Sequence, residues 1–367
     1  MATASRLEAM NEKAIRRSLA SHAPLRRKPA TMLRRMLDWL PEDTELYGDD
    51  APTAQLERRL AELLGKPRAL FFPSGTMAQQ TVLRVHAERT GRRSFVAHPL
   101  NHLDLWEERG YAAVHGLRYV PAGERHSLLT LDDLVAVGER PAALLIELPQ
   151  RELGGLLPTW DDLVAQVGWA REQGAAAHLD GARIWEAQPY YDRPHAEIAS
   201  LFDTVYVSLY KGLEGIRGAV LAGPEDVIAE AEVWRRRLGG AIPDAWPLAV
   251  AGLMGLDTMV DRQPAFRDHA VAIARALTAD GVASVQPDPP LTPMFHVHLP
   301  VSPAAAGQAS EDMITERGVQ LFFRAQTDPL PDRCKFEVSI GENALDFTPD
   351  EVVALVRELV TRAEKVG

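Results

Sequence analysis

Two polar residues that end apolar segments are the strongest candidates for chemistry in this sequence of 367 residues. Asp180 lies in HLDGAR (residues 178–183), and Lys211 lies in SLYKGL (residues 208–213). A lysine that loses its hydration in a crevice has a lowered pKa, so its amine can form a Schiff base with an aldehyde. A buried carboxylate needs a partner, which could be a helix terminus, Arg183 or a protonated heterocyclic nitrogen.

The spacing of these two residues favours a shared site. One expected helix and one expected strand separate Asp180 from Lys211, so both should emerge at neighbouring strand ends on one rim of a sheet. A single lysine after a strand is more often a surface residue, and it is the spacing that favours function here. Arg183 adds a guanidinium fork that suits a substrate carboxylate.

A third candidate is the turn Pro73-Ser74-Gly75-Thr76, which follows an apolar segment and opens a helical one. Such a turn offers free backbone N–H groups and a hydroxyl to an anion such as a phosphate. A strand-to-helix turn with an ordinary Ser or Thr cap has the same sequence, so the turn alone decides nothing.

Short apolar segments alternate with amphipathic ones through the first two thirds of the chain. A helix is expected from Thr53, as its cap, to Gly65, because leucines recur there at helical spacing. Nearly continuous apolar strands between helices predict an α/β fold, with a mostly parallel sheet covered on both sides. The seven expected strands are Ala69–Phe72, Ser94–Ala97, Gly116–Val120, Ala142–Leu148, Ala175–Leu179, Thr204–Leu209 and Gly218–Ala222.

The pattern divides the chain into three parts. Residues 1–44 are interpreted as a helical arm that packs on the body or on a neighbouring subunit. Residues 45–258 form the large α/β domain. Residues 259–367 form a smaller α+β domain. This part has a proline-rich segment, a strand of alternating apolar and polar residues and a terminal helix.

Composition excludes several classes of protein. The net charge of -11 and the pI near 5.5 argue against nucleic acid or an anionic membrane as partner, because neutralising phosphates requires a basic face. No apolar run is long enough to predict a membrane span. One cysteine, Cys334, allows no internal disulfide and favours a reducing compartment, the cytosol. The histidines His98, His102, His296 and His298 lack convincing metal-site spacing, so no metal is expected.

Taken in order, these motifs resemble the threonine aldolase and β-eliminating lyase group of pyridoxal-phosphate (PLP) enzymes. The resemblance runs from about Tyr47 to Asp257. It is specific because the matching segments occur in the same order and at the same spacing as in the family. The matching segments are Tyr47–Asp50, Phe72–Thr76, His102 with Glu107, Glu147 with Gly154-Gly155, His178–Arg183, Lys211–Leu213 and Leu238–Gly240.

The resemblance implies a fold and a set of roles. The fold would be that of type I PLP enzymes, a three-layer sandwich around a mostly parallel seven-stranded sheet with a smaller C-terminal domain. Lys211 would bind PLP as an internal aldimine, Asp180 would keep the pyridine nitrogen protonated and His102 would stack on the ring. The phosphate would be held by Ser74, Gly75, Thr76 and Ser208.

It also implies an amino-acid substrate and shared sites in a homodimer or homotetramer. Arg183 would bind the substrate carboxylate, Tyr47 would reach the site of a partner subunit, and His102 would take the proton of a β-hydroxyl group, directly or through water. The expected reaction is retro-aldol cleavage of a β-hydroxy-α-amino acid to glycine and an aldehyde.

Some positions depart from the family pattern. Gln150 stands where the family has a histidine near the substrate, and an amide cannot act as a base at neutral pH. Pro243 stands in place of the arginine that binds a neighbour's phosphate. Phe336 occupies the expected place of a second carboxylate-binding arginine, for which Lys335 could substitute without the bidentate fork.

These departures leave other functions open. The same cofactor chemistry could serve β-elimination, β-replacement or racemisation, because proton transfer at Cα by Lys211 does not depend on residue 150. A third hypothesis is a PLP-fold binding protein without turnover, against which the presence of both Asp180 and Lys211 argues. The sequence does not identify the amino acid, the stereochemistry or the number of subunits.

Overall fold

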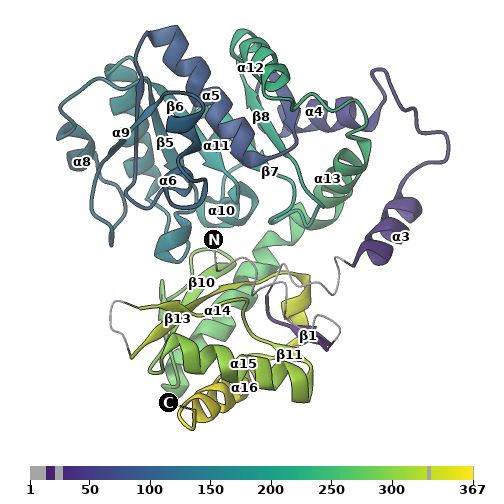
Figure 1. Ribbon diagram of the computed structural model, residues 1–367, viewed down its shortest axis with the longest axis vertical. Coiled ribbons are helices and arrows are strands. Elements are labelled where there is room, and N and C mark those ends of the chain that lie inside the picture. The colour runs from purple at the N-terminus through teal and green to yellow at the C-terminus, as the bar shows by residue number, and fades with distance from the viewer. Residues whose placement is uncertain (1–13, 21–27, 329–331, 367) are drawn as a thin grey trace. The chain divides into compact units, whose positions relative to one another are not determined.

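The computed structural model describes residues 14–20, 28–328 and 332–366, which divide into two compact units. The larger unit comprises Met36–Glu152 and Leu156–Asp261 (Figure 1). The smaller unit comprises the chain up to Arg35, the short segment Leu153–Gly155 and the chain from Arg262 onward. The expected start of the small domain at residue 259 lies three residues before Arg262.

The larger unit is built on a seven-stranded sheet of order β2-β8-β7-β6-β5-β3-β4. Strands β3 to β7 pair in parallel, and β8 runs antiparallel to both of its neighbours, so the sheet is mostly parallel as expected. The strands are β2 (Arg68–Phe72), β3 (Ser94–Ala97), β4 (Arg118–Pro121), β5 (Ala143–Glu147), β6 (Ala176–Gly181), β7 (Thr204–Ser208) and β8 (Ala219–Gly223).

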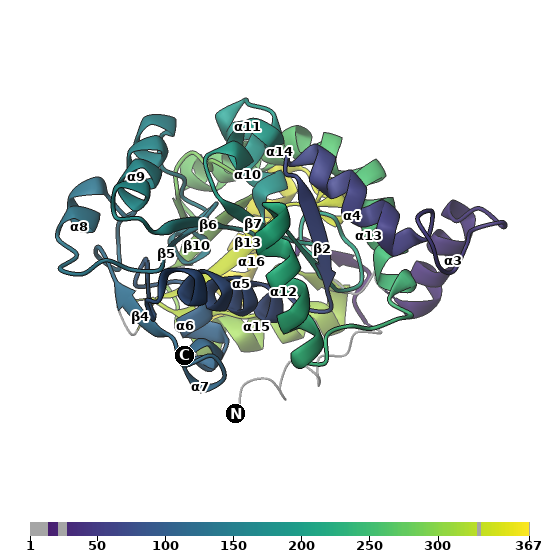
Figure 2. The same ribbon diagram turned by 90° about the horizontal axis from the view of Figure 1, so that it is seen from above.

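Helices cover this sheet because its strands are apolar along almost their whole length. Helices α5 (Gly75–Thr90) and α12 (Glu225–Arg237) pack together over β2 and β8, where Phe72, Val82 and Leu221 are completely buried in one cluster. Figure 2 shows α5 and α12 on one side of the strands and α4 on the other. The remaining helices of the unit are α4 (Pro52–Leu63), α6 (His102–Trp106), α7 (Gly110–Ala113), α8 (Leu131–Val135), α9 (Trp160–Glu172), α10 (Ile184–Tyr191), α11 (His195–Ser200) and α13 (Trp246–Met259).

The predicted start of α4 is wrong by two residues. Its N-cap is Ala51, with no side-chain cap, rather than Thr53. Pro52 sets the first turn instead, because its fixed φ suits a helix start and its missing N–H would have no helical partner there. Gly65 follows the helix end with a φ of +60°, a conformation that suits glycine, as the sequence predicts.

The smaller unit is an α+β structure. Strands β9 (Ser284–Gln286), β10 (Met294–Leu299), β12 (Gln326–Thr327) and β13 (Cys334–Ser339) form an antiparallel sheet, with β10 between β9 and β13. Helices α14 (Gln263–Asp280), α15 (Pro303–Arg317) and α16 (Pro349–Ala363) pack with it. A separate two-stranded sheet pairs β1 (Arg17–Ser18) in parallel with β11 (Val319–Gln320), and the buried Ser18 hydroxyl donates to Gln320 Oε1 at 2.9 Å.

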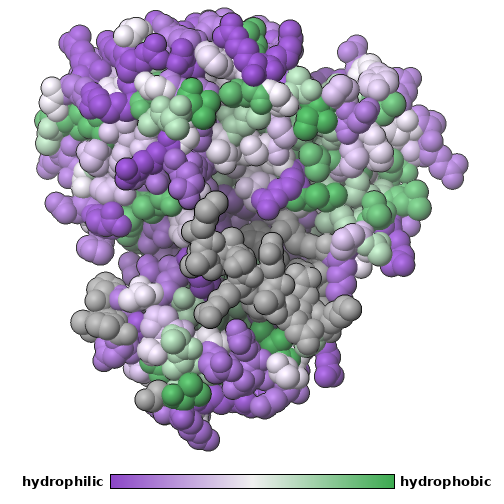
Figure 3. All heavy atoms as spheres, viewed as in Figure 1, coloured by the Kyte–Doolittle hydropathy of each residue, from purple (hydrophilic) through white to green (hydrophobic). Residues whose placement is uncertain are grey.

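The expected N-terminal helical arm lies only partly within the described residues. Helix α3 (Pro29–Trp39) lies within it, but Arg17–Ser18 form strand β1, so this part of the expected arm is not helical. Residues 1–13 and 21–27 lie outside the described part of the chain. Leu33 and Leu37, one helical turn apart on α3, are 63% and 74% exposed, and Figure 3 shows apolar residues on the surface in this region. Among the described residues, no helix combines the length and the apolar run needed to cross a lipid bilayer.

Candidate active site

Asp180 lies at the carboxyl end of β6, between β5 and β7 in the centre of the sheet. Gln79, from the first turns of α5, donates from Nε2 to Asp180 Oδ2 at 2.8 Å, and the backbone N–H of Ala182 donates to Oδ1 at 3.0 Å. Both carboxylate oxygens thus accept a hydrogen bond from a neutral donor. The Asp180 side chain is buried, so these donors replace the water that it would otherwise require.

Lys211 lies in the loop that leaves the end of β7, the strand next to β6. Burial and the nearby Arg183 guanidinium lower the pKa of Lys211 to about 8, while Asp180 opposes this shift. The amine therefore carries a substantial neutral, nucleophilic fraction near neutral pH. The structure thus places Lys211 and Asp180 at adjacent strand ends and within electrostatic reach of each other.

The turn before α5, where the sequence predicts an anion site, lies on the same rim. Ser74 is the N-cap of α5, and its hydroxyl accepts from the Met77 N–H at 3.2 Å. Gly75 begins the helix where a Cβ would overlap the hydroxyl of Tyr206, so this position requires glycine. Ser208, at the end of β7, is completely buried. Ser74 therefore caps the helix, and the N–H groups of the first turn of α5 could donate hydrogen bonds to an anion.

His102 is the first residue of helix α6, and two carboxyl groups lie next to it. Its backbone N–H donates to Glu147 Oε1 at 2.6 Å, and its ring Nε2 lies 3.8 Å from Glu107 Oε1. Burial lowers the pKa of His102 to about 4, while the charge of Asp180 opposes this shift. Burial raises the pKa of Glu147 to about 8, and Asp180 adds to this effect. The His102 ring is therefore neutral at pH 7 and able to accept a proton.

Two arginines contribute positive charge to this region. Arg183 is buried directly after the Asp180 loop, and its Nε lies 3.3 Å from Glu186 Oε2. Arg151 packs over the ring of Trp106 at 5.6 Å and forms an ion pair of 3.2 Å with Glu152. Both guanidinium groups lower the pKa of Lys211, although burial is the larger cause.

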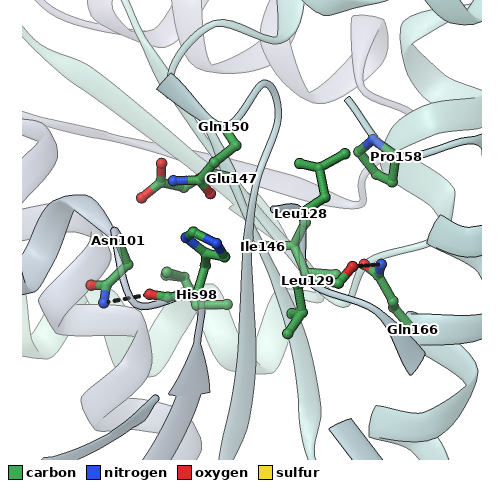
Figure 4. Close-up of a pocket in the computed structure, with 10 residues that line it drawn as sticks. His98, Asn101, Leu128, Leu129, Ile146, Glu147, Gln150, Pro158 and Gln166 are labelled. Atoms are coloured by element: carbon green, nitrogen blue, oxygen red, sulfur yellow. Dashed lines mark hydrogen bonds between the residues drawn. The ribbon is translucent and has the colours of Figure 1, made fainter. Parts of the chain in front are cut away.

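Gln150 follows β5 and is buried beside the site. Its Nε2 donates to the backbone carbonyl of Leu100 at 3.2 Å. Figure 4 shows Gln150 and Glu147 on one side of a small cavity, with the His98 ring facing them. Leu128, Leu129 and Pro158 are among its apolar lining.

Two further expected site residues are Tyr47 and Lys335. Tyr47 is 62% exposed, and its hydroxyl donates to Asp244 Oδ1 at 3.1 Å. This bond joins two segments that the resemblance assigns to subunit contacts. Lys335 lies on β13, in the smaller unit. Among the described residues, no three His, Cys, Asp or Glu side chains are grouped as a metal site.

Sequence reasoning missed several residues of the cluster. Gln79, Arg151 and Glu186 were not among the candidates, and Glu107 was noted only as part of a motif. The available signal was the pair Gln79-Gln80, because these two polar side chains lie among the apolar residues of α5 that pack on the sheet, and both are buried.

Comparison with known proteins identifies the family. The sequence matches the family model of β-eliminating lyases over residues 27–301, more than half of the chain. This protein belongs to the β-eliminating lyase family. As a family member it is a PLP-dependent lyase of the threonine-aldolase type. Among curated relatives, the low specificity L-threonine aldolase of Escherichia coli K12 is 31% identical over 285 residues, which cover 76% of this chain and 84% of that protein.

Solved structures of the family agree with this assignment. A candidate L-allo-threonine aldolase from Listeria monocytogenes is 34% identical, with a TM-score of 0.89 over 98% of this chain and 99% of that chain. A candidate aromatic amino acid β-eliminating lyase/threonine aldolase from Exiguobacterium is 32% identical, with a TM-score of 0.88 over 97% and 99% of the two chains. A serine palmitoyltransferase from Sphingomonas wittichii, 14% identical with a TM-score of 0.65 over 95% and 87%, shows the fold alone. The expected type I fold is confirmed.

Proposed function

We propose that this lyase cleaves a β-hydroxy-α-amino acid into glycine and an aldehyde. The observation that carries the proposal is the cluster in which neutral His102 lies within the electrostatic field of Asp180, Lys211 and Arg183. Cleavage of the Cα–Cβ bond requires a base for the β-hydroxyl proton, and a neutral imidazole can serve. The names of the curated relatives, low specificity L-threonine aldolases, point to the same chemistry.

The residues present fit PLP. Gln79 Oε1 is a buried acceptor without a hydrogen-bond partner among the described residues, next to the Asp180 carboxylate. Gly75 leaves the first turn of α5 open, whereas a larger residue would meet Tyr206. An amine of lowered pKa, a carboxylate and an anion-binding helix start therefore occupy one rim.

The roles of the site residues follow from this fit. Lys211 would hold PLP covalently, Asp180 would bind its ring nitrogen and His102 would cover its ring face. Thr76, Ser208 and the N-terminus of α5, begun by Ser74 and Gly75, would bind the phosphate. The bound group supplies a sink for the electrons of the bond that breaks at Cα.

The remaining steps belong to protein groups. Arg183, held by Glu186, binds the amino-acid carboxylate and so sets which bond at Cα is aligned for cleavage. His102 accepts the β-hydroxyl proton as the Cα–Cβ bond breaks and the aldehyde leaves. Cα then gains one proton, so the substrate yields one glycine and one aldehyde without another reactant.

Gln150 narrows the choice of base. Its amide is engaged with the Leu100 carbonyl and cannot take up a proton at neutral pH. The base is therefore His102 rather than a group at position 150. In this proposal Gln150 contacts the substrate as a polar neighbour, and Lys335 remains the sequence-based candidate for a second carboxylate contact.

One observation favours a second candidate, β-elimination or another reaction at the Cα–H bond. The pKa of Lys211, lowered to about 8 mainly by burial, makes its amine a competent base for the Cα proton. Elimination would release a keto acid from the same amino acid, so the product distinguishes the two reactions.

We also propose that the protein is a homo-oligomer with shared sites. Tyr47, hydrogen-bonded to Asp244, and Leu37 are exposed on the larger unit. Exposed apolar and aromatic side chains of this kind commonly mark subunit contacts. Sedimentation of the purified protein tests this, and a monomer at micromolar concentration would contradict it.

The reaction is tested with purified protein and a panel of amino acids. We expect borohydride to fix PLP on Lys211 and the variant Lys211→Ala to lose this label. Threonine, its allo isomer and longer β-hydroxy analogues should yield glycine and an aldehyde in equal amounts. Keto acid without glycine would establish elimination instead, and absence of both products from every substrate would refute the proposal.

A further inference from the structure

Glu107, at the end of helix α6, is a buried carboxylate that the reaction described above does not use. Only 3% of its side chain is exposed. Gln80 Nε2 donates to Glu107 Oε2 at 2.9 Å. Burial raises the pKa of Glu107, while Gln80 and Thr76 oppose this shift. The carboxylate therefore joins the start of α5 to the helix that carries His102.

The backbone after Glu107 is bent in a way that brings these groups together. Glu108 and Arg109 both adopt left-handed conformations, with φ of 50° and 54°, which residues with a side chain rarely adopt. The bend brings Gly110 against the Gln80 amide so closely that a Cβ at position 110 would lie 2.7 Å from it. The same bend begins helix α7, whose N-cap is Arg109, so the position of Glu107 relative to Gln80 is fixed by the backbone on both sides of the contact.

The second oxygen of Glu107 faces the His102 ring, at 3.8 Å from Nε2. A carboxylate that faces one ring nitrogen favours the tautomer in which that nitrogen carries the proton. The other nitrogen, Nδ1, is then the basic one. The other charged groups that act on the ring are Asp180 on β6, Lys211 after β7, and Arg151 and Arg183. Of the two ring nitrogens, Nε2 is the one directed at Glu107.

We propose that Glu107 is a positioning residue that holds the His102 ring with its proton on Nε2, so that Nδ1 receives the β-hydroxyl proton of the substrate. This inference rests on the proposed function, because it assigns a tautomer to the proposed base. The proton passes from the substrate hydroxyl to Nδ1, and Glu107 stabilises the resulting imidazolium without taking a proton itself.

The direct test is the variant Glu107→Gln, whose side chain has the same shape without the charge. Gln80 still donates to position 107, so the oxygen of the new amide turns toward Gln80 and its NH2 group faces His102. A donor facing Nε2 moves the ring proton to Nδ1 and blocks the proposed base. Histidine-selective 15N NMR of the holoenzyme at pH 8 reads the tautomer directly, with His102→Asn identifying the signals.

Two further variants separate positioning from general damage. Glu108→Gln makes the same chemical change one residue later, on an exposed side chain, and should alter neither tautomer nor activity. The double variant Gln80→Glu with Glu107→Gln exchanges the two groups across their hydrogen bond. The amide at position 107 then donates to the new carboxylate and turns its oxygen to His102, so the original tautomer should return.

The expected result is an Nε2–H tautomer in the wild type, an Nδ1–H tautomer in Glu107→Gln and recovery of Nε2–H in the double variant. Cleavage, as kcat/KM, should fall at least about tenfold in Glu107→Gln and recover partly in the double variant. A wild-type ring with its proton on Nδ1 would overturn the proposal even if no variant folds. So would an unchanged tautomer in folded Glu107→Gln. The NMR result does not depend on turnover, so an enzyme that yields no aldehyde would refute the proposed reaction and leave this test valid.

Discussion

Two buried histidines should make the stability of the larger unit strongly dependent on pH. His86 on α5 and His178 on β6 are both within 3.0 Å of the Thr204 hydroxyl. Burial lowers the pKa of His86 to about 4 and that of His178 to about 3. The two rings are therefore neutral in the folded protein, and folding excludes the protons that the unfolded chain would bind.

The size of the effect follows from linkage. An unfolded histidine has a pKa of 6.5, above both folded values. The contribution of the neutral rings to the free energy of unfolding is therefore fully present above pH 6.5 and is lost as pH falls from there through 4. At pH 5, which is 1.5 units below 6.5, protonation stabilises the unfolded state by about 1.5 × 1.36, or ~2 kcal/mol, for each histidine. His86 and His178 together should therefore cost ~4 kcal/mol between pH 8 and pH 5, a large share of the ~5–15 kcal/mol typical of a domain.

Urea denaturation of the wild type and of His86→Gln at pH 8 and pH 5 measures this effect. The glutamine amide can still bond to Thr204 but cannot be protonated, so the loss of unfolding free energy between the two pH values should shrink by ~2 kcal/mol. His126→Gln, in an exposed position, is the control and should behave as the wild type. The reasoning is refuted if His86→Gln loses as much stability as the wild type between pH 8 and pH 5.

Three other changes should affect the site directly. Gly75→Ala places a methyl group on the Tyr206 hydroxyl, so PLP affinity should fall at least about tenfold and the melting temperature should drop, as equilibrium dialysis and calorimetry will show. Gln79→Leu leaves Asp180 Oδ2 without its buried donor, which should cost ~1–3 kcal/mol, and an unchanged PLP dissociation constant and melting temperature would contradict the assigned contact. Because the Lys211 amine is protonated below its pKa of about 8, the rate at which PLP attaches to apoprotein should rise with pH up to about 8 and then level off, which stopped-flow absorbance can follow.

Much of the larger unit could be predicted because its signals are local. Each expected strand overlaps an observed one, since a strand buried on both faces must be apolar along its length. The proximity of Asp180 and Lys211 also followed from the sequence, because neighbouring parallel strands have their carboxyl ends on the same rim. The connection between them holds two helices, α10 and α11, where one was expected.

The contacts that complete the site could not be predicted in the same way. Gln79 and Asp180 are 101 positions apart, and only the packing of α5 on the sheet brings them to 2.8 Å. Arg183 was expected to bind a substrate carboxylate, and the sequence analysis did not anticipate its contact with Glu186, one helical turn later. The Thr53 cap failed for a local reason, since Pro52 already satisfies the helix start.

The pairing of Arg17–Ser18 with Val319–Gln320 limits how this chain can be cut. A fragment that begins at Arg262 would lack the strand that β11 pairs with, together with the Leu153–Gly155 segment. It would leave the Gln320 amide, which is completely buried, without its Ser18 hydrogen bond. A continuous C-terminal piece should therefore be less stable than the smaller unit of the full chain, and deletion of the first twenty residues should destabilise a region encoded three hundred residues later.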